Sequence, residues 1–184
     1  YCMRKKVLYS LLVAVFIFAS YVIYLVLNPV SPLETVNFSK NDKIISLNYS
    51  RPYKKDRLIF GDESDGALVP YGNYWRTGAN RHTVIETETE LNILGNILKA
   101  GKYSLFTVPG IDSWDITFNS SNAYFGIMRP DPVNDMFTVT IPTVKLGNSI
   151  EQLTIDFINL ETEDNLTFGL RIRWDLTEVV IPFN

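Results

Sequence analysis

The chain has 184 residues, enough for one domain and an anchoring segment, and its 46% hydrophobic and 13% aromatic content excludes global disorder. Three of the 17 basic residues (Arg4, Lys5 and Lys6) precede residue 7. The remainder therefore carries 14 basic against 20 acidic residues, a net charge of −6 that disfavours binding to nucleic acid.

The only cysteine, Cys2, precedes the first hydrophobic stretch. An internal disulfide and a zinc site built on several cysteines are therefore excluded. The absence of disulfides favours a protein of the bacterial cell envelope over a secreted eukaryotic domain.

An uncharged apolar stretch covers residues 7–27. Roughly 21 residues at about 1.5 Å each span about 31 Å, the thickness of the hydrocarbon core of a bilayer. We therefore expect residues 1–28 to contain a transmembrane signal anchor whose partner is the lipid bilayer. The positive-inside rule keeps Arg4, Lys5 and Lys6 in the cytoplasm, so the anchor lies in the inner membrane and the following domain in the periplasm. A cleaved signal peptide and a buried core helix are the alternatives.

Pro29 and Pro32 end this helix, because proline lacks the amide donor and restricts the residue before it. We expect a linker over residues 29–40 and one extracytoplasmic domain over residues 41–184. The domain shows short runs rich in Val, Ile, Thr, Phe and Tyr between turn residues, which predicts an all-β, antiparallel β-sandwich or jelly-roll-like fold. The expected strands, about ten in number, cover residues 43–49, 82–89, 91–94, 103–108, 114–118, 124–128, 136–144, 153–160, 166–174 and 178–182.

Two long loops interrupt the strands, a basic one over residues 50–57 and a glycine-rich, aromatic one over residues 60–79. Loops of about twenty residues are uncommon in compact domains and are frequently functional. A ligand site is therefore expected here.

Several short runs in and around these loops carry a family resemblance, the most specific being WRTGAN at residues 75–80. The other runs are YSRP (49–52), RLIFG (57–61), LVPYG (68–72), AGKYSLFT (100–107), Pro109-Gly110, Trp114, Phe118-Asn119, TIDF (154–157) and Trp174. Over residues 31–183 the chain resembles the family known as domain of unknown function 2911, which is frequent in envelope proteins of Bacteroidota. The resemblance implies a place in the envelope and no particular activity. Two features depart from the family pattern: typical members carry cleavable signals, and residues 62–65 form a small acidic insertion.

Arginine forks and indole faces bind carboxylates, phosphates or sugar rings. The alternative is structural, since long loops need buried polar side chains to satisfy their main chain. The candidate ligand-binding residues are Arg51, Arg57, Tyr71, Trp75, Arg76, Asn80 and His82.

No catalytic residue and no cofactor is predicted. His82 is the only histidine, so a site that requires two imidazoles is excluded. The sequence also lacks a nucleophile elbow, a phosphate-binding loop and a zinc-protease motif. No metal ligand is predicted either, since Asp131, Asn134 and Asp135 are explained more simply by a turn than by a cation site.

Glu86, Glu88 and Glu90 alternate along one expected strand and therefore share one face. This arrangement suggests a glycosidase or a calcium site, but a solvated outer face is the simpler interpretation. The sequence thus favours a ligand- or protein-binding module without enzymatic activity, with a small ligand or an envelope protein as its partner. An accessory subunit of a membrane complex and a glycan-acting enzyme are the alternatives.

Overall fold

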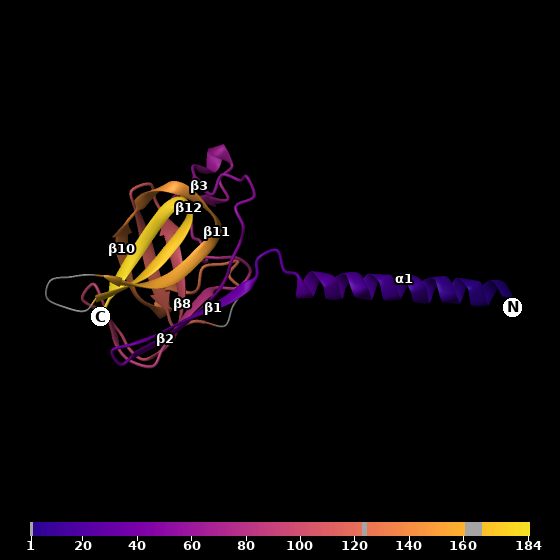
Figure 1. Cartoon of the computed structure of the whole chain (residues 1–184), viewed down its shortest axis with the longest axis horizontal. Helices are drawn as coiled ribbons and strands as arrows, with labels where there is room; N and C mark the ends of the chain where they lie inside the picture. The colour runs from indigo at the N-terminus through magenta and orange to yellow at the C-terminus, as the bar shows by residue number, and fades with distance from the viewer. Residues whose placement is uncertain (1, 123–124, 161–166) are drawn as a thin grey trace.

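The computed structural model describes residues 2–122, 125–160 and 167–184. Its single helix, α1 (Cys2–Leu27), extends away from the β-strands as one rod (Figure 1). The helix ends where the sequence predicts, because both the main-chain and side-chain amides of Asn28 donate to the carbonyl of Tyr24, at 2.9 and 3.0 Å, immediately before Pro29. Within the described part of the chain, no helix is both long and apolar enough to cross a membrane.

A six-stranded antiparallel sheet forms the larger part of the domain. Its first two strands form a tight hairpin whose turn residues, Asn41 and Asp42, have positive φ (46° and 61°), as expected for a two-residue loop that matches the twist of the strands. In spatial order the strands are β1 (Leu33–Lys40), β2 (Lys43–Ser50), β5 (Thr83–Thr87), β8 (Gly101–Pro109), β9 (Ser113–Asn119) and β10 (Asp135–Pro142).

A hairpin of two 17-residue strands, β11 (Val144–Leu160) and β12 (Thr167–Phe183), covers the apolar face of this sheet (Figure 1). Two smaller pairs complete the strands: β3 (Phe60–Gly61) lies parallel to β4 (Val69–Pro70), and β6 (Leu91–Ile93) is antiparallel to β7 (Asn96–Leu98). Two 3₁₀ turns, η1 (Glu63–Asp65) and η2 (Pro132–Asn134), lie in the connections.

Two aromatic groups fill the core between the sheet and the hairpin. At one end Phe38 of β1 contacts Phe157, Phe168 and Phe183 of the hairpin, with ring centroids 4.8–5.5 Å apart. At the other end Trp114 and Trp174 pack around Phe60 and Trp75. These contacts bury the alternating apolar side chains that the strand pattern predicts.

Tyr49 also joins the two layers, since its hydroxyl accepts the amide of Ile155 at 2.9 Å. Burial raises the pKa of Tyr49 above its usual 10, so the hydroxyl stays neutral and available for this contact.

The mostly β architecture with antiparallel sheets is confirmed, whereas the sandwich or jelly-roll type stays a prediction. Several boundaries differ from expectation, and β11, for example, begins at Val144, nine residues before the expected strand over 153–160. Residues 33–40 of the expected linker form β1, because they pair with β2 along their whole length. Residues 125–128 form a bridge and a turn instead of a strand, and the expected strands over 166–174 and 178–182 are one strand that continues through Asp175 (φ 50°). Residues 124 and 166, at the ends of two expected strands, lie outside the described residues.

Candidate functional site

The two long loops are fastened by main-chain hydrogen bonds. The amides of Leu68, Val69 and Tyr71 donate to the carbonyls of Leu58, Ile59 and Gly61 at 2.8–2.9 Å, which aligns the two halves of the glycine-rich loop. The amide of Gly72 then donates to Pro109 O at 2.8 Å. The loops therefore present their side chains from an ordered backbone.

Trp75 belongs to the core. Its side chain is 7% exposed, stacks on Trp174 with ring centroids 5.9 Å apart, and donates from Nε1 to Gly78 O at 3.1 Å. Its main chain exchanges two hydrogen bonds with Thr107 of β8, at 2.7 and 2.9 Å. The expectation that Trp75 offers an open indole face to a ligand does not fit this burial, because the core already occupies its ring.

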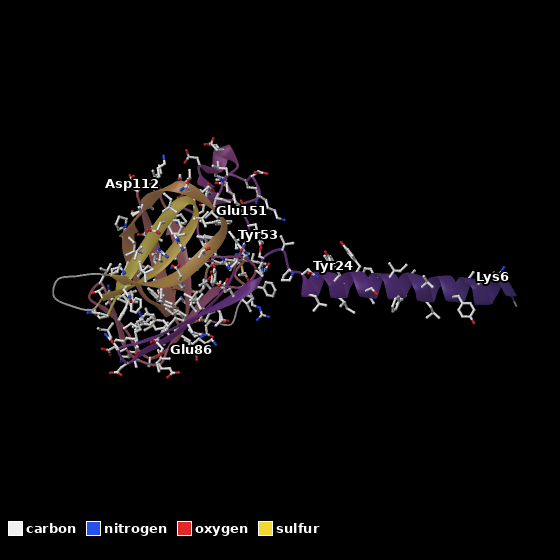
Figure 2. All side chains as sticks on the ribbon, viewed as in Figure 1. Lys6, Tyr24, Tyr53, Glu86, Asp112 and Glu151 are labelled. Carbon is white, nitrogen blue, oxygen red and sulfur yellow. The ribbon has the colours of Figure 1, made fainter. Side chains whose placement is uncertain are left out.

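A cavity of about 260 Å³ nevertheless lies beside Trp75. It brings together four of the seven candidate residues: Arg57, Trp75, Arg76 and Asn80. Half-exposed Tyr53 lines it and lies close to the point where the chain from α1 enters the domain (Figure 2). The remaining lining residues are Val30, Ser31, Pro52, Leu68, Val69, Gly78, Ala79 and Trp174, so the described lining contains two guanidinium groups and no carboxylate.

Each of these two arginines is held by one side of its guanidinium group. Arg57 donates from Nε to Lys54 O at 2.9 Å and from Nη2 to the carbonyl of Tyr53. Arg76 donates from Nη1 to Asn80 O at 3.1 Å, across a turn in which Asn80 has φ 61°. Within the described residues this leaves Nη1 of Arg57 and Nε and Nη2 of Arg76 without a hydrogen bond, so both groups retain donors for an oxyanion.

The other candidate residues lie outside this cavity. Arg51 is structural: it pairs with Glu34 and donates to Leu153 O (3.0 Å) and to Thr154 Oγ1 (3.1 Å), which joins β1 to β11. Tyr71 packs against the core, and burial raises the pKa of its hydroxyl, with the negative charge of Asp62 acting in the same direction.

His82 is only 3% exposed, and its Nδ1 is 3.4 Å from Ser104 Oγ. Burial lowers the pKa of His82 below its usual 6.5, although a main-chain interaction with Met128 opposes the shift. The ring is therefore neutral near pH 7. This agrees with a structural role more than with that of an exposed base.

A polar cluster that the sequence did not predict surrounds His82. Tyr74 lies edge-on to Phe106, and the guanidinium carbon of Arg129 lies 5.0 Å from the centroid of the same Phe106 ring. Burial raises the pKa of Tyr74 to about 12, and its hydroxyl has no hydrogen-bond partner among the described residues. The only sequence signal was that Ser104 and Phe106 alternate with the core residues of their strand, which places them on its other face.

A second cavity, of about 520 Å³, opens beside His82. Arg81 lines it together with Leu33 and Phe125, and the main chain of Arg81 pairs with that of Phe125. Arg81 was not a candidate from the sequence, because its neighbour in this cavity lies more than forty residues further along the chain. Asn48, His82, Val84, Lys102 and Asn122 complete the lining.

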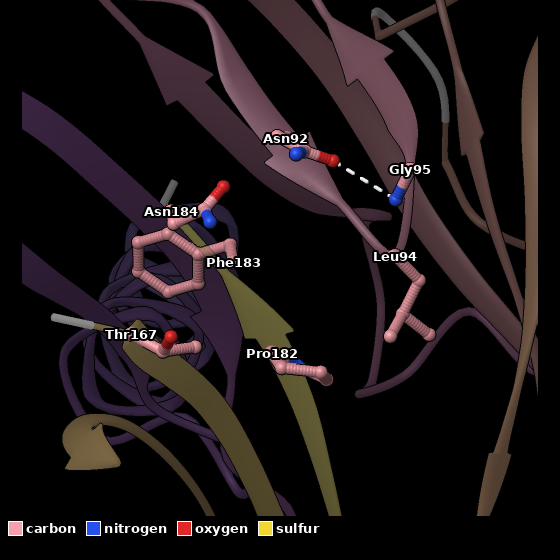
Figure 3. A pocket seen from close by; sticks show the side chains of 7 residues that line it. All are labelled: Asn92, Leu94, Gly95, Thr167, Pro182, Phe183 and Asn184. Atoms are coloured by element: carbon pink, nitrogen blue, oxygen red, sulfur yellow. Dashed lines mark hydrogen bonds between the residues drawn. The ribbon is translucent and has the colours of Figure 1, made fainter. Parts of the chain in front are cut away.

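A third cavity, of about 170 Å³, lies where β6 meets the end of β12 (Figure 3). Asn92 Oδ1 accepts the amide of Gly95 there at 2.9 Å, and the main chains of Asn92 and Asn184 exchange two hydrogen bonds. The described lining carries no ionisable side chain.

The acidic candidates are exposed or paired. Glu86, Glu88 and Glu90 all face solvent, and Glu86 pairs with Lys102 at 3.2 Å. They do not form the enclosed pair that a glycosidase requires. Asp131 caps η2 by accepting the amide of Val133 at 3.0 Å, and Asp135 pairs with Arg129 at 2.5 Å, as expected for a turn.

The model of the family described as "Protein of unknown function (DUF2911)" matches residues 31–183. No curated protein and no solved structure matches the chain.

Proposed function

The chain belongs to the DUF2911 family of proteins of unknown function, and we propose that it is a membrane-tethered, extracytoplasmic β-domain that binds an oxyanion-bearing ligand in the cavity lined by Arg57 and Arg76. The single observation that carries this proposal is the composition of the cavity, which has two guanidinium groups and no carboxylate among its described lining residues. The shared chemistry of the ligand is a carboxylate or a phosphate group.

The charge balance supports an anionic ligand. The chain after residue 6 has 20 acidic and 14 basic residues. The two arginines that line a cavity without a carboxylate therefore contrast with the overall excess of acidic residues. Guanidinium groups match the planar geometry of carboxylate and phosphate oxygens through paired hydrogen bonds. Trp75 supports the site as a core side chain, and the carbonyl of Asn80 accepts the hydrogen bond that orients Arg76.

The tether rests on the whole sequence of residues 7–27, which contains no charged residue. The described side chains in this part of α1 are exposed on all sides of the helix. An apolar helix of this kind is stabilised by lipid or by other apolar helices. With Arg4, Lys5 and Lys6 on the cytoplasmic side of the inner membrane, the domain would lie in the periplasm.

A second candidate function follows from the same helix. Ala14, Ala19 and Ser20 are small residues that let helices approach closely, which suits an accessory subunit of a membrane complex. This function predicts that a membrane partner co-purifies with the full chain in mild detergent and is lost when residues 1–28 are deleted.

Ligand binding is tested by calorimetric titration of the full chain in mild detergent with inorganic phosphate and, separately, with benzoate. We expect saturable binding of at least one anion, weakened about tenfold or more by Arg57→Gln or by Arg76→Gln, because a hydrogen bond to a charged group contributes about 1.5–3 kcal/mol. Lys145→Gln is the matched control, since Lys145 is an exposed cation that lines none of the cavities described above.

The two anions separate the carboxylate from the phosphate form of the proposal. Binding that survives both arginine substitutions would show that the cavity is not the site. The absence of saturable binding of either anion would refute the ligand class.

A further inference from the structure

The short segment 125–128 presents its apolar side chains to solvent. Phe125, Ile127 and Met128 are 67%, 71% and 78% exposed, and we call residues 125–128 the apolar loop. We propose that the apolar loop, together with the neighbouring arginines, docks onto the surface of an anionic lipid bilayer. The position of that bilayer rests on the proposed tether, and two of the arginines, Arg57 and Arg76, also line the proposed anion-binding cavity.

The outward direction of these side chains is fixed by packing. Gly126 lies against the adjacent segment so closely that a Cβ atom at this position would be 2.7 Å from His82 Cδ2 and 2.8 Å from Arg76 Cβ. The amide of Gly126 also donates to Asn80 O at 3.0 Å, and Ile127 N donates to Phe125 O at 2.8 Å. With Gly126 pressed inward, the three large apolar residues around it point outward.

Three arginines without a carboxylate partner among the described residues lie near the apolar loop. Seven arginines follow residue 30, and four of them (51, 129, 171 and 173) form ion pairs with carboxylates. The other three, Arg57, Arg76 and Arg81, have no carboxylate within 4.0 Å among the described residues. Arg81 lines the same cavity as Phe125, Arg76 lies against Gly126, and Arg57 shares a cavity with Arg76.

Exposed apolar side chains bordered by arginines match the interface of an anionic bilayer. Apolar groups leave water for the acyl boundary while cations meet the lipid phosphates, and the negative surface potential attracts such clusters. A protein partner of the same surface would need carboxylates facing the arginines. The charge complementarity to phospholipid, together with the position of the surface, favours the bilayer.

The covalent connection keeps this surface near the membrane. Five residues separate Leu27, the end of α1, from Leu33 at the start of β1, so six Cα-to-Cα steps join the two. A chain of that length reaches at most about 20 Å, since an extended residue spans about 3.3–3.6 Å. Leu33 lines the same cavity as Arg81 and Phe125, and Val30 lines the cavity of Arg57 and Arg76, so the tether enters the domain beside the proposed surface.

The test places an environment-sensitive fluorophore on the apolar loop of the full chain. In a Cys2→Ser background, Met128→Cys carries the label, and Ile111→Cys is the matched control. Ile111 is a similarly exposed apolar residue (69%) next to Asp112, which Figure 2 places on the side of the domain that faces away from α1. Both proteins are incorporated into phosphatidylcholine vesicles with or without phosphatidylglycerol.

We expect the label at residue 128 to shift to shorter emission wavelength and to be quenched by doxyl-labelled lipid in vesicles that contain phosphatidylglycerol. The label at residue 111 should remain as in detergent. Arg81→Gln and 0.5 M salt should both reduce the signal at residue 128, because they weaken attraction to the lipid phosphates.

Equal signals at residues 128 and 111, or a signal at 128 that neither phosphatidylglycerol nor Arg81→Gln changes, would overturn the proposal. Failure of the chain to float with anionic vesicles would overturn it as well, because the surface is proposed to bind them. An error in the proposed tether would be recognised separately. The chain would then not float with neutral vesicles, yet it would still bind anionic ones in a salt-sensitive manner. Absence of anion binding by calorimetry in detergent would refute the cavity ligand alone, because the docking test depends on the label at residue 128 and on Arg81, which does not line that cavity.

Discussion

Trp75 provides the clearest way to distinguish support of the cavity from contact with its ligand. Trp75→Ala removes an indole that is 7% exposed and lies between Phe60, Trp114 and Trp174, with ring centroids 5.7–5.9 Å away. Replacement of a buried Trp by Ala costs about 3–5 kcal/mol. The lost hydrogen bond to Gly78 O adds about 1 kcal/mol.

The expected change in melting temperature follows from the size of the domain. For roughly 150 residues, 1 kcal/mol shifts the midpoint by about 2–4 °C, so Trp75→Ala should melt about 8–24 °C below the parent chain. Differential scanning calorimetry of the full chain in mild detergent measures this shift. Trp75→Phe keeps an aromatic ring in the core, and we expect it to cost only about 1–2 kcal/mol.

Arg76→Gln is the adjacent control, because its side chain reaches the rim of the cavity and leaves the core unchanged. It should alter stability by no more than about 0.5 kcal/mol while weakening anion binding. A Trp75→Ala chain that melts within about 2 °C of the parent would refute the assignment of Trp75 to the core. An open indole that contacts the ligand would then be the better account.

Two other substitutions test the polar cluster and the apolar loop. Gly126→Ala should lower the melting temperature by several degrees, because the added Cβ would clash with His82 and Arg76. Gly147→Ala, with open space around its Cβ, should be neutral in the same calorimetric scan. Equal effects of the two substitutions would show that the loop is not packed inward. His82 is neutral in the folded state because its pKa is lowered, so the unfolded chain alone takes up a proton as pH falls through 6.5 and stability is lost below that pH. The fall in melting temperature from pH 7.5 to 5.5 should therefore be smaller in His82→Gln, and an unchanged pH dependence would contradict the burial of this ring.

Strands with a clear alternation of apolar and polar residues were predictable from the sequence. Ile45, Leu47 and Tyr49 of β2 are buried on one face as expected. β1 was missed because its residues are mostly exposed and only Phe38 is buried, so its pairing with β2 decides its structure. β12 was divided in two because Asp175 resembles a turn residue, whereas its positive φ is accommodated inside one long strand.

The sequence predicted which loop lines the candidate cavity, but it did not predict the role of each residue in that loop. The run of Arg, Trp and Asn around residue 76 marked the segment that lines the cavity. The sequence gives no measure of burial, so it did not distinguish Trp75, held in the core, from Arg76 at the rim. Arg81 and the apolar loop meet through main-chain pairing across more than forty residues, which no local pattern shows.

The long final hairpin has a consequence for biosynthesis. Trp174 and Phe183 of β12 cover aromatic side chains contributed by strands made much earlier, including Phe38 of β1. At a synthesis rate of about 5–20 residues per second, the apolar face of the six-stranded sheet remains uncovered for several seconds or longer, until β12 has been made. A chaperone that shields nascent strands during this interval would limit their aggregation, and a chain that terminates before β12 should be degraded instead of accumulating.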